Sequence, residues 1–238
     1  MGVRVGVIDI GSNTARLLVA ERTRGGAEPV GEAKTYLRLG AEIQRTGGVR
    51  REKLAEAAEE TRRFATVARE LGASALDIFI TAPGRQAANG DELVAAVARA
   101  TGHVVRVLSS REEGELAWEG AVATTPLLRD PIAVCDVGGG STQLTVGDRR
   151  TGVHWSRSFA VGSLRLTAGM LDRDPPSSEQ FREAAAHVEE RLADLEAPAV
   201  GSVLAVGGSA RALSPKPICS GRTPSVTLPA EYGRPLAW

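Results

Sequence analysis

Apolar residues follow two different periods in the first half of the chain, and each period predicts a different element. Residues 3–10 and 15–22 are apolar runs on either side of a short polar turn, which predicts a hairpin, and a third strand is expected at residues 33–39. Residues 52–71 have the period of a helix. Its apolar stripe consists of Leu54, Ala58, Thr61, Phe64, Ala65, Ala68 and Leu71.

Shorter elements complete this half. We expect a strand at residues 76–81, a helix at residues 91–100 that Asp91 caps, and another strand at residues 104–108. Ser109 or Ser110 can cap the helix that follows, because a serine hydroxyl accepts hydrogen bonds from the free amides at a helix start. Glu112 and Glu113 then lie in its first turn, the end that favours acidic side chains.

The second half repeats this order. Three strands, an amphipathic helix and a last strand are predicted at residues 131–136, 142–146, 152–161, 177–195 and 203–206. The apolar face of that helix consists of Phe181, Ala185, Val188, Leu192 and Leu195. A repeated order of three strands, helix and strand indicates an internal duplication. It also indicates mixed sheets covered by helices.

We therefore predict an α/β protein with two lobes and a cleft between them. The expected division is residues 1–125 and 126–213, because the pattern is interrupted near residues 123–129. The tail, residues 214–238, is rich in Pro, Gly and Ser and has no period, so no element is assigned to it.

Composition and charge narrow the function classes. The 238 residues include 29 Lys and Arg and 29 Asp and Glu, so global charge gives no argument for nucleic-acid binding. No apolar run is long enough to cross a membrane, and no secretory signal is visible, which favours the cytoplasm. Cys135 and Cys219 are too few for a disulfide framework or a zinc site, and the three histidines are scattered.

One short motif occurs twice. The chain reads V-I-D-I-G-S-N-T at residues 7–14 and V-C-D-V-G-G-G-S-T at residues 134–142. In both, an apolar run ends in Asp and is followed by Gly and a small hydroxyl residue. Such turns present backbone amides and hydroxyls to an anionic oxygen. The two sets of candidate phosphate-binding residues are Asp9, Gly11, Ser12 and Asn13, and Asp136, Gly138, Gly139, Gly140, Ser141 and Thr142.

Other residues extend this phosphate-handling interpretation. Two glycines and a serine, Gly207, Gly208 and Ser209, follow the last strand and precede Arg211, where a helix start would suit an anion. Arg85 follows a buried strand and could contact phosphate with two N–H groups, while Arg106 and Arg111 are weaker candidates. A carboxylate repels phosphate. Asp9 and Asp136 would therefore fit a phosphate site if a divalent cation or a water molecule lay between them and the phosphate.

Five segments together resemble the exopolyphosphatase/guanosine-pentaphosphate phosphatase family, within the actin-like, sugar-kinase-like ATPase superfamily. They are D-I-G-S-N-T, T-A-P-G-R-Q-A-A-N, L-S-S-R-E-E-G-E-L, D-V-G-G-G-S-T-Q-L and V-G-G-S-A-R-A-L, spread over residues 3–213. The resemblance implies a duplicated ribonuclease-H-like fold and hydrolysis of terminal phosphoanhydrides in polyphosphate or guanosine pentaphosphate. It also implies a magnesium-type cation and a homodimer.

The same resemblance assigns roles to residues. Glu113 matches the catalytic glutamate that activates water, and Asp136 matches the acid tied to metal and water positioning. Arg85, the two Asp-Gly loops and Gly208 with Ser209 match the phosphate-binding segments. Asp9 and Gln143 are weaker candidates for metal ligands.

The chain departs from the family pattern at three places. Ser110 replaces a usual Gly before the acidic pair, which we expect to be tolerated, and the other two departures matter more. Gln143 replaces a usual Glu; it keeps an oxygen ligand but loses the charge, so we expect weaker metal affinity or a lower rate. The Pro-rich tail stands where the family continues with a helical segment, so the second lobe is expected to be incomplete.

Two other functions stay open on the sequence. An actin-like ATP-dependent kinase shares the twin loops but needs an adenosine pocket and an acceptor site. A non-catalytic binder of polyphosphate or alarmone would accommodate Gln143 and the atypical tail. Turnover measured separately from binding distinguishes these alternatives.

Overall fold

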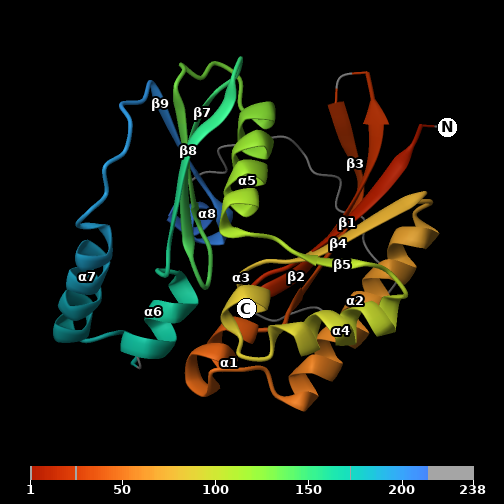
Figure 1. Ribbon diagram of the computed structural model, residues 1–238, viewed down its shortest axis with the longest axis horizontal. Coiled ribbons are helices and arrows are strands. Elements are labelled where there is room, and N and C mark those ends of the chain that lie inside the picture. The colour runs from red at the N-terminus through yellow and green to blue at the C-terminus, as the bar shows by residue number, and fades with distance from the viewer. Residues whose placement is uncertain (1, 25, 172, 214–238) are drawn as a thin grey trace.

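The chain forms two α/β lobes that lie side by side (Figure 1). The computed structural model describes residues 2–24, 26–171 and 173–213. The expected tail at residues 214–238, which includes Cys219, lies outside this range. The first sheet has the strand order β3-β2-β1-β4-β5 and the second β8-β7-β6-β9. The predicted two-lobed fold with mixed sheets is confirmed.

The first sheet is built as the sequence predicts. β1 (Arg4–Ile10), β2 (Thr14–Thr23) and β3 (Gly26–Tyr36) form an antiparallel meander, and β4 (Ala75–Ile80) and β5 (Val105–Val107) add parallel strands. The third strand is earlier and longer than expected. Its first half is mostly exposed and contains Pro29, which an edge strand tolerates because one row of its backbone groups needs no partner.

The second sheet repeats this topology. β6 (Ile132–Val137), β7 (Thr142–Asp148) and β8 (Gly152–Phe159) form the meander, and β9 (Ser202–Val206) pairs parallel with β6. β6 and β9 therefore stand to each other as β1 and β4 do in the first lobe. The duplication that the strand pattern predicts is present in the backbone pairing itself.

Helices α2 (Arg51–Glu70) and α4 (Gly90–Thr101) pack against each other and cover the first sheet. The buried side of α2 comprises Ala57, Ala58, Thr61, Phe64, Val67 and Ala68, close to the predicted stripe. Helix α4 begins one residue before Asp91, and Asn89 occupies the N-cap position, although its side chain accepts no capping hydrogen bond. The expected cap was therefore wrong, and Asp91 lies in the first turn.

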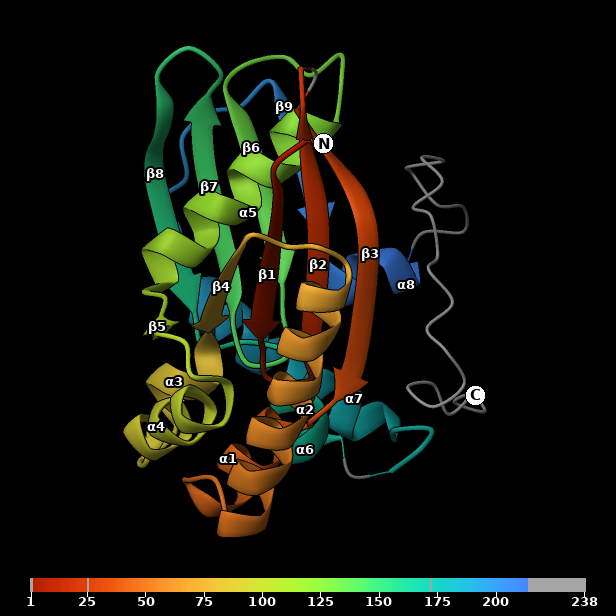
Figure 2. The same cartoon turned by 90° about the vertical axis from the view of Figure 1, so that its right-hand side faces the viewer.

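Helix α5 (Ser110–Thr124) lies on the sheet that follows it in the sequence. Figures 1 and 2 both show it against β7 and β8, and its contacts run to β6, β7 and β8. Ser109 caps it, accepting from the Glu112 amide at 3.1 Å, while Glu112 accepts from the Ser109 amide at 2.8 Å. This cap fixes the start of the helix and therefore the position of Glu113 in its first turn.

Helix α7 (Ser178–Leu192) has the predicted span but does not bury its apolar face. Phe181 is 66% exposed, and Ala184 is the buried residue of the helix. It packs against α6 (Ser163–Met170), and Figure 1 shows it standing apart from the second sheet. The helical period alone could not reveal this, because a period defines a face but not what covers it.

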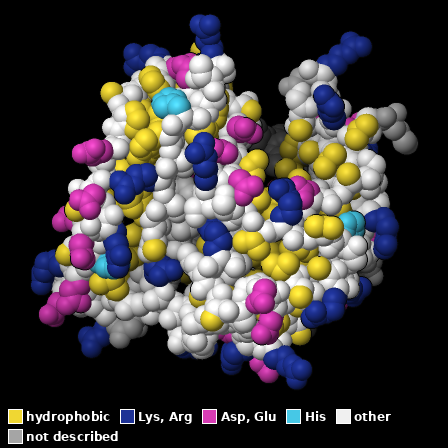
Figure 3. All heavy atoms as spheres, in the orientation of Figure 1, with side chains coloured by type: hydrophobic (Ala, Val, Ile, Leu, Met, Phe, Trp, Pro, Cys, Tyr) yellow, Lys and Arg dark blue, Asp and Glu magenta, His cyan; other side chains and the backbone are white. Residues whose placement is uncertain are grey.

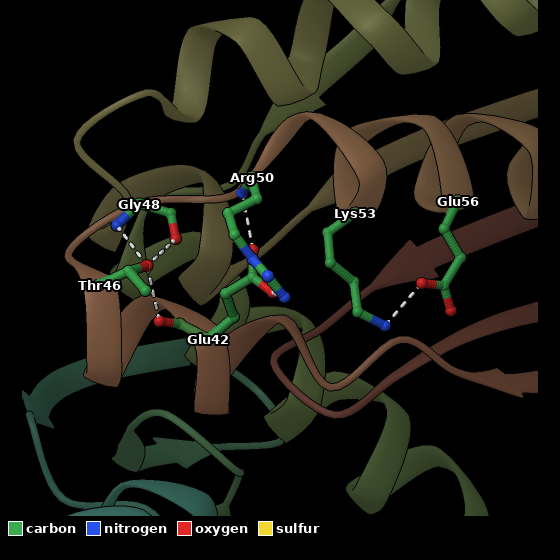
Figure 4. Close-up of polar contacts among 6 residues, drawn as sticks. All are labelled: Glu42, Thr46, Gly48, Arg50, Lys53 and Glu56. Carbon is green, nitrogen blue, oxygen red and sulfur yellow. Dashed lines mark hydrogen bonds and ion pairs between the residues drawn. The ribbon is translucent and has the colours of Figure 1, made fainter.

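An ion pair between buried Glu42 and the exposed Arg50 side chain fixes helix α1 (Leu39–Thr46) to the start of α2 (Figure 4). Glu42 accepts hydrogen bonds from the Arg50 amide at 2.6 Å and from the Arg50 guanidinium at 3.1 Å. Burial alone would raise the pKa of Glu42, but the contacts from Arg50 outweigh it and hold the pKa below its usual value. This anchoring matters because α1 supports one of the candidate loops.

Two remaining short helices are α3 (Ala82–Gln86) and α8 (Gly207–Leu213). On the face in Figure 3, a notch separates the lobes at the top, and basic and acidic side chains are interspersed on the outer surface. Among the described helices, none is both long enough and apolar enough to cross a membrane.

Candidate active site

The candidate site lies where the carboxyl ends of the parallel strands in both sheets meet. Asp9 lies near the end of β1, Thr81 follows β4, Asp136 lies near the end of β6, and Gly207 follows β9. A cleft of about 780 Å³ is lined by all four together with the loops at residues 11–13 and 138–141. Ligands in open α/β sheets bind at this edge, because loops and helix starts converge there.

The two predicted loops have the same internal geometry. In the first, the Gly11 amide donates to the Thr14 carbonyl at 2.9 Å; in the second, the Gly138 amide donates to the Ser141 carbonyl at 3.0 Å. Both bonds join residues three apart, two positions after the motif Asp. The sequence repeat is therefore a repeat of backbone conformation.

A second similarity was not foreseen from the sequence. After β3, the amides of Arg38 and Gly40 donate to the first loop, at the carbonyls of Asn13 (2.9 Å) and Ser12 (2.7 Å). After β8, the segment that opens α6 does the same for the second loop: Ser163 donates to Gly138 at 3.0 Å and Arg165 to Gly139 at 3.1 Å. Helices α1 and α6 thus hold the carbonyls of the two loops, and they pack against each other.

The loops also approach one another across the floor of the cleft. A Cβ atom on Gly140 would lie 2.5 Å from the Ser12 hydroxyl, so only glycine fits there without a shift. In the described part of the chain, the amides of Ser12, Asn13, Gly139 and Gly140 donate no hydrogen bond, and all four residues line the cleft. Unpaired amides in two loops that line one cleft suit the oxygens of a phosphoryl group.

Three carboxylates share this cleft, and each has a raised pKa. Burial, followed by the nearby Glu113 and Asp136 charges, raises the pKa of Asp9 to about 6, although Arg16 opposes this. Burial raises the pKa of Glu113 against the effect of Arg85, and burial raises that of Asp136 against Arg211 and Arg16. Grouped acids that are costly to ionise are typical of functional sites.

One oxygen of Asp9, Oδ1, is buried and has no hydrogen-bond partner among the described residues. Gly207, in the left-handed region at φ +90°, lies so close to Asp136 that an added Cβ would be 2.6 Å from Asp136 Oδ1. A side chain at position 207 would therefore crowd the Asp136 carboxylate.

Comparison with known proteins follows this geometry. The model of the Ppx/GppA phosphatase family matches residues 18–214. The chain belongs to this family. The match includes the second Asp-Gly loop, Glu113 and the Gly207 turn.

Individual members of the Ppx/GppA family agree. The chain is 31% identical to exopolyphosphatase 2 of Mycobacterium tuberculosis over 198 residues, 79% of this chain and 61% of that protein. It is 26% identical to a guanosine-5'-triphosphate,3'-diphosphate pyrophosphatase of Aeromonas hydrophila over 226 residues, 93% of this chain and 45% of that protein. A crystal structure of an exopolyphosphatase-like protein superposes with a TM-score of 0.78 at 30% identity, covering 87% of this chain and 67% of the other.

The chain spans less than two thirds of the length of the curated Ppx/GppA relatives described above. The family and the actin-like fold rest on the shared region.

Most, but not all, sequence-predicted site residues of this Ppx/GppA chain line the cleft. Those that do include the acids, the glycines of both loops, Gly208 and Ser209. Arg85, Thr142 and Gln143 do not. Arg85 instead donates to Glu113 Oε2 and to the Leu108 carbonyl, both at 2.6 Å, and Thr142 donates to the Val161 carbonyl at 2.8 Å. Arg106 and Arg111 pair with surface acids, Asp77 and Glu115, away from the cleft.

The lining residues that sequence reasoning missed include three side chains on β2 and β3, namely Arg16, Lys34 and Tyr36. Arg16 lies directly opposite Asp9 on the neighbouring strand and opposite Lys34 on the other side. The alternation of β2 could have placed Arg16 on the Asp9 face once the pairing register was known.

Proposed function

We propose that the chain hydrolyses terminal phosphoanhydride bonds and releases orthophosphate from inorganic polyphosphate, guanosine pentaphosphate or both. The observation that carries the proposal is the position of Glu113, whose carboxylate lines the same cleft as both glycine loops. The names of the relatives, an exopolyphosphatase and a guanosine pentaphosphate pyrophosphatase, support this substrate class.

The proposed reaction uses few groups. The free amides of the two loops bind the oxygens of the terminal phosphoryl group and offset its charge. Glu113 accepts a proton from a water molecule as the water oxygen attacks phosphorus, and the bond to the bridging oxygen breaks. The bridging oxygen leaves on the shortened substrate. The raised pKa of Glu113 favours this role, because a more basic carboxylate removes the proton more readily.

A divalent cation fits the residues present. In residues 2–24, 26–171 and 173–213, no three His, Cys, Asp or Glu side chains are grouped to hold a metal ion by themselves. Magnesium, however, is commonly held by one or two carboxylates together with substrate phosphates. Asp9, with its unpartnered Oδ1, and Asp136 would supply those carboxylates. A bound cation would neutralise charge on the phosphates.

Cations on the cleft wall support a substrate with several phosphates. Arg16 and Lys34 lie opposite each other on β2 and β3, and Arg211 of α8 lines the same cleft. Like charges directly opposite on paired strands repel each other, which favours an anion between them. A chain of phosphates extending from the loops would be such an anion.

The test measures phosphate release from long-chain polyphosphate and from guanosine pentaphosphate, with and without magnesium. We expect Glu113→Gln to lower release by about a hundredfold or more while ligand binding is kept, because general-base catalysis commonly contributes that much. Glu112→Gln is the matched control: Glu112 is exposed and lies in the helix cap, where Gln can replace Glu.

Other outcomes assign other functions. Binding of polyphosphate without release by the folded wild type would identify a non-catalytic binder. Phosphate transfer from ATP to an added sugar, without hydrolysis of polyphosphate, would identify a kinase. Equal loss in Glu112→Gln and Glu113→Gln would remove Glu113 from the role of base.

A further inference from the structure

Glu113 is held from behind the cleft wall by two donors that share one of its oxygens. An Arg85 guanidinium nitrogen lies 2.6 Å from Oε2, and the Gln143 side-chain nitrogen lies 3.3 Å from the same atom. The described residues provide no donor to Oε1. Both hydrogen bonds thus hold the same carboxylate oxygen, and the other oxygen remains available to a water molecule.

Gln143 connects the Glu113 carboxylate to the second phosphate loop. Its side chain is 2% exposed, and its Nε2 also lies 2.9 Å from the Ser141 hydroxyl. A carboxylate can only accept hydrogen bonds, so the amide group that faces Glu113 must be the NH₂. On the strand, Gln143 pairs directly with Asp136. A neutral donor therefore joins Glu113 to the second phosphate loop.

We propose that Gln143 is a positioning residue for Glu113. Its amide, together with Arg85, fixes the carboxylate so that Oε1 faces the attacking water, and its contact with Ser141 sets this orientation relative to the bound phosphoryl group. The inference rests on the proposed function, since it assigns Gln143 to the same hydrolysis. It replaces the sequence-based expectation that Gln143 serves as a weak metal ligand.

The two roles predict opposite effects of a carboxylate at this position. Under the positioning role, Gln143→Glu places an acceptor against Glu113, so the hydrogen bond is lost and kcat falls. Under a metal-ligand role, the added charge strengthens metal binding, so kcat rises and less magnesium is needed. Gln143→Met is the second variant, because it fills a similar volume without any donor.

The control is Thr145→Val. Thr145 lies two residues along the same strand face, is 1% exposed, and loses one hydrogen bond, to the Ser156 hydroxyl at 3.2 Å. It matches Gln143 in burial but forms no hydrogen bond with Glu113 in the described part of the chain. Circular dichroism and thermal melting of every variant show that each is folded.

We expect Gln143→Met and Gln143→Glu to lower kcat by about ten- to a hundredfold, the cost of a slightly misplaced catalytic group. KM and the magnesium requirement should stay within about twofold, and Thr145→Val should resemble the wild type in all three. A merely structural role for Gln143 would not separate kcat from KM in this way.

Three results would overturn the inference. A wild-type kcat in folded Gln143→Met would show that Glu113 needs no amide donor. A higher kcat with a lower magnesium requirement in Gln143→Glu would assign Gln143 to the metal. Absence of release by the wild-type chain would defeat the proposed function and this inference together, which distinguishes it from the first two results.

Discussion

Arg85 and Glu113 form a short ion pair, with 2.6 Å between the guanidinium nitrogen and Oε2, although they are 28 residues apart in the sequence. The pair joins α3 of the first lobe to α5, which packs on the second sheet. Both side chains are largely buried. The arginine expected to bind phosphate therefore contacts the proposed base instead.

Replacement of Arg85 should affect catalysis more than substrate binding. We expect Arg85→Met to lower kcat by about tenfold with little change in KM, because Glu113 loses its strongest orienting contact. Arg85 lowers the pKa of Glu113, so its removal should raise that pKa and shift the acidic limb of the pH–rate profile upward. Steady-state rates over a pH series measure both effects.

Arg106→Met is the control for this prediction, since Arg106 pairs with Asp77 on the surface and is not among the residues that line the cleft. A raised KM with an unchanged kcat in Arg85→Met would contradict the prediction and favour the sequence-based phosphate contact.

The contact of Arg85 illustrates which features of the site can be predicted from the sequence and which cannot. The twin Asp-Gly loops were predictable, because a repeated motif between predicted strands fixes a repeated turn. The partner of Arg85 was not, since no local signal tells which carboxylate a folded chain brings beside an arginine. Helices α1 and α6 were also missed. Each has only eight residues, and neither has a side-chain cap.

Burial was predictable on the sheets but not on α7. Ile8, Ile10, Leu17 and Val19 alternate as strand residues do, and all are buried. The stripe around Phe181 has an equally clear period, yet Phe181 is exposed. In this fold, helices pack on the central strands of the first sheet and bury their side chains. A peripheral helix buries its apolar face only if another element packs on it.

Lys34 should contribute to the binding of long phosphate chains. Its ammonium lies 2.9 Å from the Tyr36 hydroxyl and beside Arg16 on the cleft wall. We expect Lys34→Met to raise KM for polyphosphate by about two- to fivefold, the scale of one exposed charge contact, with kcat nearly unchanged. The effect should shrink at high salt, because exposed charges are screened.

The matched control is Lys53→Met. Lys53 lies on α2, where its ammonium contacts Glu56 at 2.6 Å (Figure 4), and it does not line the cleft. Equal KM values for Lys34→Met and the wild type at low salt would remove Lys34 from the substrate path.

Asp9 should make the stability of the fold depend on pH. In the folded chain its pKa is about 6, compared with 3.8 ordinarily, so between these values the folded state keeps a proton that the unfolded state has lost. The free energy of unfolding therefore falls as pH rises through this window, by about 3 kcal/mol in total. About half of that loss should occur between pH 5 and pH 8.

Asp9→Asn removes the charge and with it this dependence. We expect the variant to be more stable than the wild type at pH 8 in buffer containing a chelator, and the difference to shrink toward pH 4. Magnesium should narrow the gap at pH 8, because a cation that binds ionised Asp9 stabilises only the wild type. Urea unfolding at several pH values measures these differences.

Asp77→Asn, a substitution of an exposed surface acid, controls for the loss of a carboxylate in general. Parallel pH profiles for Asp9→Asn and the wild type would mean that Asp9 carries its charge at no cost, and that its buried Oδ1 is satisfied in solution by a group such as water.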